Sequence, residues 1–203
     1  LKRDVLILFD TGGVRLQEAN AGELAIAEIM RALIEARLAG RKVIGLIGGR
    51  AGCYGGGSLI AGCCTRLIVS EQGRISVSGP EVIETNRGVE EFDSRDRALV
   101  WRTMGGKHRY LIGAADVLVD DDAAAFRNAA LTALQEAGGF DLDVLAAEQQ
   151  RLEYRLERFG NARDAVDIWT ALGITNPSSL PELATEDFLQ HVQGKREASD
   201  DAR

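Results

Sequence analysis

Apolar residues in the first part of the chain form short continuous runs separated by stretches with helical spacing. The runs predict strands over Asp4–Asp10, Val43–Gly49, Arg66–Ser70, Arg74–Ser78 and from Asp116, of which Val43–Gly49 is expected to be covered on both faces. Apolar positions three and four apart predict helices over Ala21–Ala39, over Ser58–Cys64 and on both sides of Gly105-Gly106. Strands that alternate with helices favour an α/β fold with a parallel sheet.

From Phe140 the pattern changes to charge-laced amphipathic helices, over Asp141–Phe159, around Ala162–Gly173 and after Pro181. We predict a core over 1–139, a helical appendage over 140–193 and a solvated tail over 194–203. The appendage packs on the core or on a partner, and the pattern leaves both open. Its apolar stripe includes Leu142, Leu145, Leu152, Leu156, Trp169 and Leu172.

The first predicted strand follows Leu1-Lys2-Arg3 directly, without an initiator methionine. A parallel strand that is apolar throughout usually has neighbours on both sides. We therefore expect a further N-terminal segment or another subunit to cover it.

Composition excludes several classes of function. The formal net charge is −7 and the sequence pI is about 5.0, which disfavours nucleic acid and anionic membrane surfaces as partners. No apolar run reaches the ~20 residues of a membrane span, so we expect a cytoplasmic protein. The cysteines Cys53, Cys63 and Cys64 lack paired C-x-x-C spacing, which predicts reduced thiols and no metal site. Cys53 lies in a glycine loop, where we expect an exposed thiol.

That loop, GGRAGCYGGGSLIAG, joins the second strand to a helix, with Gly55, Gly56 and Gly57 at the helix N-terminus. First-turn amides have no intrahelical acceptor and carry the positive end of the helix dipole. The loop fits neither a dinucleotide fingerprint nor a P-loop, because no lysine precedes Ser58, and it lacks the G-x-S-x-G of a nucleophile elbow. An oxyanion hole and a tight packing turn remain as interpretations.

Two further motifs follow strands. The loop TGGVRLQE begins at Thr11, and parallel strands would bring it to the same sheet edge as the triple glycine. One amide from Gly12 or Gly13 and one from Gly55 or Gly56 would then converge on a single carbonyl oxygen. The third motif, GPEVIETNRG, carries Glu81 and is either part of the site or a solvated loop.

These three motifs, in this order and at these separations, resemble the N-terminal-type domain of biotin-dependent carboxyltransferases in the crotonase superfamily. The run from Asp10 to Asp122 more closely resembles the β subunits of biotin-independent malonate decarboxylases. The resemblance implies a crotonase-like (ClpP/crotonase) ββα superhelix of the carboxyltransferase N-domain type, followed here by the helical appendage.

The resemblance also implies a function. A malonyl thioester on an acyl carrier protein would lose CO2 and give the acetyl thioester through an enolate. The chain itself would bind no cofactor, since the carrier protein brings a phosphopantetheine-type group, and a γ subunit of related fold would be its partner. Gly55 and Gly56 match the oxyanion pair, and Gly12 and Gly13 match the other glycine loop. The implied substrate-binding residues are Tyr54, Gly57, Ser58, Gly79 and Pro80.

Several points stay open at this level. Glu81, Tyr54 or His108 could protonate the carbanion, although a lone histidine is more often a surface or interface residue. Leu59 stands where enoyl-thioester hydratases carry a glutamate, which excludes hydration. Carboxyl transfer to biotin and a non-catalytic assembly role remain as alternatives. Docking of an acidic carrier protein would need a local basic cluster, for which the candidates are Arg87, Arg102, Lys107 and Arg109.

Overall fold

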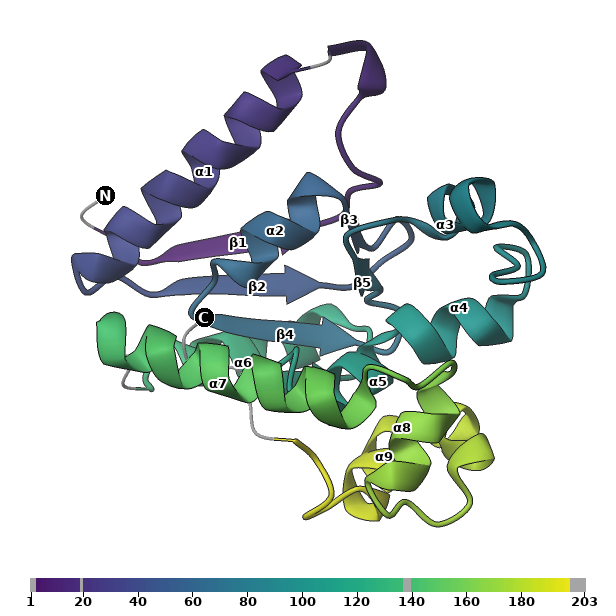
Figure 1. Ribbon diagram of the computed structural model, residues 1–203. Coiled ribbons are helices and arrows are strands. Elements are labelled where there is room, and N and C mark those ends of the chain that lie inside the picture. Colours follow the sequence, from purple (N-terminus) through teal and green to yellow (C-terminus); the bar gives the residue numbers. More distant parts are fainter. Residues whose placement is uncertain (1–2, 19, 137–139, 198–203) are drawn as a thin grey trace.

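The computed structural model describes residues 3–18, 20–136 and 140–197, and its centre is a four-stranded parallel sheet (Figure 1). The order is β1-β2-β4-β6, with β2 and β4 in the middle and almost entirely buried. The four corresponding strand predictions are confirmed, since parallel strands covered on both faces read as continuous apolar runs. The strands are β1 (Val5–Phe9), β2 (Val43–Ile47), β4 (Arg66–Ser70) and β6 (Val117–Val119).

A second, two-stranded parallel sheet pairs β3 (Cys53–Tyr54) with β5 (Ile75–Ser76). The prediction of one strand over Arg74–Ser78 is therefore wrong in extent, and this strand is not in the central sheet. The chain turns after β4 at Gly73, where a side chain would run into the Ile47 carbonyl group. A glycine is needed for this close approach, and the turn directs β5 out of the central sheet.

The two sheets and two helices form repeated ββα units. In each unit a strand of the central sheet is followed by a short strand of the second sheet and then by a helix. The units are β2-β3-α2, with α2 at Gly56–Gly62, and β4-β5-α3, with α3 at Pro80–Arg87. The helix predicted from Ser58 begins at Gly56, so two of the three glycines form its first turn.

Helices cover both faces of the central sheet (Figure 1). On one face α6 packs Ala130 and Ala133 against Ile44 and Ile68. The larger core, on the other face, includes Leu33 of α1 and residues of α2 and α5. The remaining elements of this part are η1 (Leu16–Glu18), α1 (Asn20–Leu38), α4 (Arg97–Met104), α5 (Gly106–Leu111) and α6 (Ala123–Ala133).

Strand β1 lies at the edge of the described sheet and pairs there with β2. Leu8 is 75% exposed, and an apolar groove of about 480 Å³ runs past Leu6, Leu8 and Phe126. The sequence VLILF of β1 fits a strand with neighbours on both sides. The expectation of a covering segment stays a prediction.

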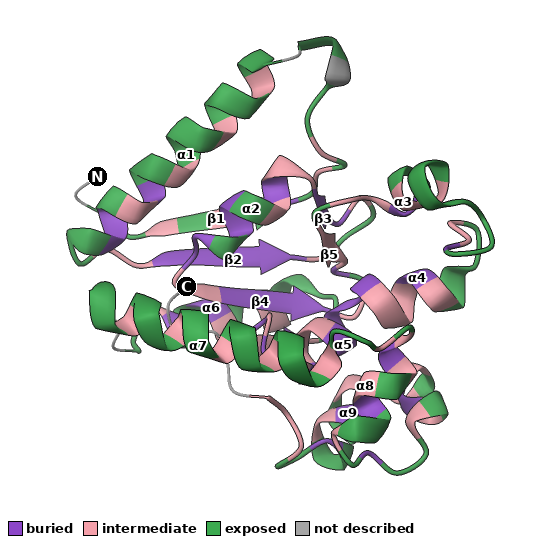
Figure 2. Cartoon of the chain, in the orientation of Figure 1, coloured by how far each residue is buried: buried purple, intermediate pink, exposed green. Residues whose placement is uncertain are grey.

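The last helices attach to the protein in two ways. Trp169, Leu180 and Phe188 are almost completely buried in the larger core. Helix α7 in contrast has no fully buried residue, and its outer side is exposed (Figure 2). Of the two alternatives for the appendage, packing on the core therefore applies to its second part. The elements are α7 (Leu142–Phe159), α8 (Ala165–Ala171), η2 (Pro177–Glu182) and α9 (Thr185–His191).

The first residues of the predicted tail are bound to α5. Arg196 Nε donates to the Tyr110 carbonyl oxygen at 2.8 Å, and the Glu197 N–H donates to that of Leu111 at 2.9 Å. These contacts return the chain to the core after α9. Residues 198–203 lie outside the described residues.

Candidate active site

The two glycine loops meet, as the sequence predicts. The Thr11 N–H donates to the Gly52 carbonyl oxygen at 2.8 Å, and the Tyr54 N–H donates to the Thr11 carbonyl oxygen at 3.0 Å. A methyl group on Gly55 would lie only 3.2 Å from Gly13 Cα. Backbone of the loop after β1 is therefore in direct contact with the turn of the β2-β3-α2 unit at the end of the sheet.

The amides at this junction differ in whether they are already paired. The Gly55 N–H donates to the carbonyl oxygens of Ser76 at 3.2 Å and Val77 at 3.1 Å, and the Gly13 N–H donates to Thr11 Oγ1 at 3.1 Å. Within the described residues, the N–H groups of Gly12 and Gly56 make no hydrogen bond. The open donors are thus Gly12 in the first loop and Gly56 in the second, where the Gly57 N–H also makes no hydrogen bond to the described residues.

Packing also requires glycine in this turn. Gly55 has φ +57°, a conformation that side chains disfavour. A methyl group on Gly56 would lie 2.6 Å from Ile26 Cγ1, and one on Gly57 would overlap the Thr11 methyl group. The packing interpretation therefore explains the missing side chains, whereas the open amides are a separate property of the same backbone.

Two polar side chains beside the turn are already engaged or shielded. The Ser58 hydroxyl donates to the Gly55 carbonyl oxygen at 2.7 Å, which is a local cap and not a nucleophile arrangement. Cys53 is completely buried, and burial raises the pKa of its thiol to about 12. The expectation of an exposed thiol is wrong because Cys53 belongs to β3 and faces the core.

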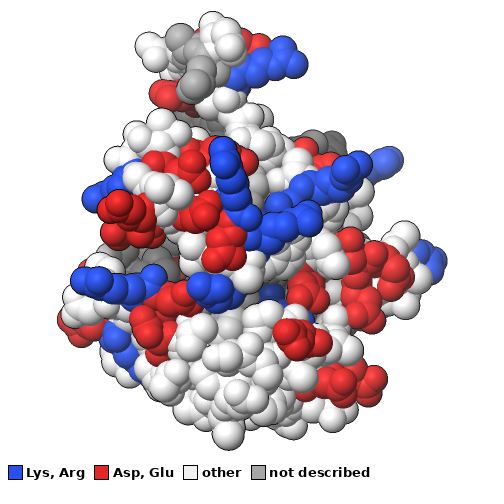
Figure 3. All heavy atoms as spheres, turned by 90° about the vertical axis from the view of Figure 1, so that its right-hand side faces the viewer, with Lys and Arg blue, Asp and Glu red and all other residues white. Residues whose placement is uncertain are grey.

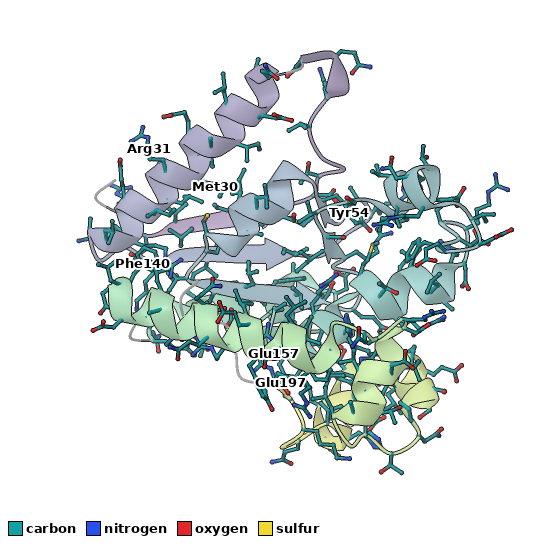
Figure 4. The ribbon with its side chains drawn as sticks, in the orientation of Figure 1. Met30, Arg31, Tyr54, Phe140, Glu157 and Glu197 are labelled. Carbon is teal, nitrogen blue, oxygen red and sulfur yellow. The ribbon has the colours of Figure 1, made fainter. Side chains whose placement is uncertain are left out.

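Tyr54 lies between the small sheet and helices α3 and α4 (Figure 4), packed against Phe92 and Met104. It is 7% exposed, and its hydroxyl group finds no hydrogen-bond partner among the described residues. Burial raises the pKa of the phenol, the guanidinium groups of Arg74 and Arg109 lower it, and the Glu81 carboxylate raises it. No spacing in the sequence relates Arg109 to Tyr54, so sequence reasoning misses this charged surrounding.

The third motif attaches to the turn through β5, whose neighbour Val77 accepts the Gly55 N–H. Gly79 is the N-cap of α3, Pro80 opens its first turn, and Glu81 follows as an exposed carboxylate. Proline and an acidic residue are typical of a helix start. The segment expected as a possible solvated loop is helical from Pro80 to Arg87.

His108 is buried, which contradicts the expectation of a surface residue. Its Nδ1 accepts a hydrogen bond from Trp169 Nε1 at 3.1 Å. Burial and the neighbouring Arg109 lower the pKa of His108 to about 3. This contact joins α5 to α8, so His108 serves the docking of the C-terminal helices.

Two of the four candidates for a basic docking cluster are already paired within the chain. Lys107 is buried and its Nζ lies 3.0 Å from Glu71 Oε1, while Arg102 pairs with Asp164 at 2.8 Å. Acidic and basic side chains interleave over the face shown in Figure 3. The expectation that these four residues dock an acidic carrier protein stays a prediction for Arg87 and Arg109.

The described residues hold no group of three or more His, Cys, Asp or Glu side chains placed to bind a metal ion. Among these same residues, no helix combines the length and the apolar character needed to cross a membrane.

Comparisons with known proteins agree with the geometry. The chain is 41% identical, over 95% of its length, to the malonyl-S-ACP:biotin-protein carboxyltransferase MADC of Malonomonas rubra, of which it covers 61%. It matches a chain of a Pseudomonas malonate decarboxylase hetero-tetramer in complex with malonate with a TM-score of 0.70 and 36% identity, over 82% of this chain and 60% of that one. It also matches a chain of a Pseudomonas MdcD-MdcE hetero-dimer with a TM-score of 0.60 and 34% identity, over 77% of this chain and 61% of that one. No family model matches.

The chain thus spans about three fifths of the length of these relatives. The predicted fold class is confirmed, because the structural neighbours are carboxyltransferases and decarboxylases of the crotonase fold. The chain has the carboxyltransferase-type crotonase fold and is homologous to a malonate decarboxylase chain and to a malonyl-S-ACP:biotin-protein carboxyltransferase.

Proposed function

We propose that this chain is the β-type subunit of a malonate decarboxylase and holds the thioester carbonyl oxygen of a malonyl group while that group loses CO2. The observation that carries the proposal is the pair of unpaired amides of Gly12 and Gly56, from two loops whose backbones touch at Gly13 and Gly55. Backbone donors held in place by strands and a helix need no reorganisation during a reaction.

The chemistry needs such donors. When the bond between the carboxylate carbon and Cα breaks, CO2 leaves and its bonding electron pair delocalises onto the thioester carbonyl oxygen. The amides of Gly12 and Gly56 stabilise that negative oxygen more than the neutral carbonyl group, which lowers the barrier. A proton then adds to Cα and gives the acetyl thioester.

The three candidate proton donors, Glu81, Tyr54 and His108, differ in how accessible they are. His108 is committed to Trp169, so it is a poor donor. Glu81 is exposed at the start of α3, next to the segment that binds Gly55, and Tyr54 is within its electrostatic range. We retain Glu81 as the first candidate, because the Tyr54 hydroxyl group is closed off from solvent.

The proposal includes partners. The Pseudomonas relatives were solved as a hetero-tetramer and a hetero-dimer, which supports a hetero-oligomer here. We place a γ subunit of related fold opposite the glycine turn as part of the proposal. The malonyl group would arrive on an acyl carrier protein through its phosphopantetheine-type arm.

A second function is favoured by one specific observation. The MADC relative, at 41% identity, is a carboxyltransferase that moves the carboxyl group from malonyl-S-ACP to a biotin protein. That reaction passes through the same enolate and would use the same two amides. The first experiment therefore measures both acetyl thioester formation and CO2 release from malonyl carrier protein by the assembled subunits, with biotin protein absent and then present, because transfer to biotin gives the acetyl thioester without free CO2.

Release of CO2 and acetyl thioester without biotin would support the decarboxylase. Turnover only when biotin protein is added would assign the transferase, and no turnover in either case would contradict both.

The amide of Gly56 can be tested separately from its packing. Because a side chain at this position meets Ile26, both variants are made with Ile26→Ala. Gly56→Ala keeps the N–H, whereas Gly56→Pro removes it at the first helical position, which proline tolerates. Loss of one oxyanion donor lowers turnover by about 100- to 1,000-fold. We expect that drop in Ile26→Ala/Gly56→Pro relative to Ile26→Ala/Gly56→Ala, measured in the assembled enzyme.

Equal turnover of the two folded double variants would reject the oxyanion role. It would favour the remaining alternative, a subunit of this fold that only assembles others.

A further inference from the structure

Helix α7 carries its leucines on the outside. Asp141 caps its start by accepting from the Val144 N–H at 2.9 Å, and the helix then runs 18 residues to Phe159. All four of its leucines are exposed, and its half-buried side chains are those of Val144, Glu148, Arg151, Arg155 and Phe159. The outer side of α7 is exposed in Figure 2. The exposed fractions are 81% for Leu142, 42% for Leu145, 43% for Leu152 and 71% for Leu156.

These leucines form one stripe. Together with Gln149 they follow the alternating spacing of three and four residues that marks the contact line of paired helices. A contiguous exposed apolar surface of this kind marks an interaction site in a folded protein.

The stripe is nearly symmetric about its centre. Leu142 and Leu156 each lie seven residues from Gln149, and Leu145 and Leu152 lie four and three residues from it. An interface between two identical subunits related by a twofold axis requires such a self-complementary surface. We propose that the leucine stripe of α7 is a homodimer interface, in which a second copy of this chain packs its α7 antiparallel across Gln149.

The charges of α7 favour an antiparallel direction. Its first half carries Asp141, Asp143 and Glu148, whereas its last turns hold both signs, with Glu153 and Glu157 beside Arg155 and Arg158. Antiparallel packing places the acidic half of each helix beside the mixed half of the other, and it also opposes the two helix dipoles. Parallel packing would bring the two acidic halves together.

The polar residue at the centre fits the same arrangement. Gln149 Nε2 now donates to Glu153 Oε1 at 2.9 Å within one exposed turn. A glutamine amide both donates and accepts, so two copies of Gln149 across a twofold axis can bond to each other. A single polar residue in an apolar contact line fixes the register of paired helices. The proposal is independent of the oxyanion site.

Sedimentation equilibrium of the full chain tests the proposal. We expect a mass twice the 21.9 kDa of one chain, with monomer appearing on dilution. Leu145→Glu/Leu152→Glu places charges in the contact and should raise the dimer Kd by about 100-fold or more, with an unchanged circular dichroism spectrum. The control is Leu24→Glu on α1, a leucine 67% exposed away from the stripe, which should leave the Kd unchanged.

Cysteine cross-linking tests the geometry. The native cysteines are buried, so a single added thiol reports contact. Gln149→Cys should form a disulfide-linked dimer, whereas Ala147→Cys, on the opposite side of α7, should not. In an antiparallel pair two copies of position 156 lie about 21 Å apart, so Leu156→Cys should also fail to cross-link.

Three results would overturn the proposal. These are a chain that is monomeric at every concentration, a dimer that survives Leu145→Glu/Leu152→Glu, and equal cross-linking at positions 147 and 149. If the leucine variants no longer bind a partner subunit but still bind a second copy of the chain, the stripe belongs to that partner and the proposal is also overturned.

Discussion

Helix α7 and the unit formed by α8, η2 and α9 come from one stretch of amphipathic sequence, yet they attach to the protein in opposite ways. The second unit places Trp169 and Phe188 in the core, with exposed fractions of 1% and 0%. Helix α7 leaves its leucines in solvent. An amphipathic pattern therefore identifies which side of a helix is apolar, but not which surface will cover it.

The difference originates in two polar residues of α5. Lys107 Nζ binds the carbonyl oxygens of Pro181 at 2.9 Å and Leu183 at 2.6 Å, and His108 accepts from Trp169. Buried polar groups that are fully paired fix one arrangement, because any other packing leaves them unpaired. These hydrogen bonds hold η2, α8 and the residue after η2, and not α7.

The largest expected effect comes from removing the main anchor of α8. Trp169→Ala deletes a side chain that is 1% exposed and leaves His108 Nδ1 without its donor. Truncation of a buried aromatic residue costs about 3–5 kcal/mol. We expect that loss in the free energy of unfolding, measured by urea denaturation. A change below about 1 kcal/mol would show that the unit is only loosely attached.

A smaller effect follows from the pKa of His108, which is about 3 in the folded chain and ordinarily 6.5. Between these values the unfolded chain binds a proton that the folded chain does not, so stability is complete above pH 6.5 and falls as pH decreases towards 3. One such group contributes a slope of up to about 1.4 kcal/mol per pH unit.

His108→Gln, which can still accept from Trp169, should lose this part of the slope. The measurement is unfolding free energy against pH for both chains. Parallel curves would contradict a buried neutral histidine.

The smallest effect is expected on α7. Leu152→Ala in monomeric protein removes a side chain that is already 43% exposed. We expect the free energy of unfolding of the monomer to change by less than about 0.5 kcal/mol, as at other surface positions. Urea denaturation at high dilution measures it, and a loss above about 2 kcal/mol would mean that the leucine packs on its own chain.

The central fold is predictable because its signals are local. The buried strands are short and apolar throughout, and the order of strands and helices sets a parallel sheet. The small sheet was missed because β3 and β5 are each two residues long, and Gly73 turns the chain there through a tertiary contact with Ile47. Sequence patterns do not report such contacts.

The candidate site was predictable in position but not in detail. The contact between the glycine loops follows from parallel strands ending at one edge. Which amides stay open does not follow from the sequence. The Gly55 N–H donates to Ser76 of β5 and to Val77 just after it, and the sequence pattern does not show that β5 lies in a second sheet beside the glycine turn. The same holds for His108, whose burial depends on a helix about sixty residues later.

The double hydrogen bond from Gly55 to Ser76 and Val77 has a consequence for how the protein can be altered. It anchors the glycine turn to the small sheet, outside the four strands that make up most of the core. The proposed site and most of the core thus depend on different strands. Random mutagenesis of β5 and the residues just after it should therefore yield inactive chains that still express and keep their melting temperature. Mutagenesis of β2 should instead yield chains that express poorly and have a lowered melting temperature.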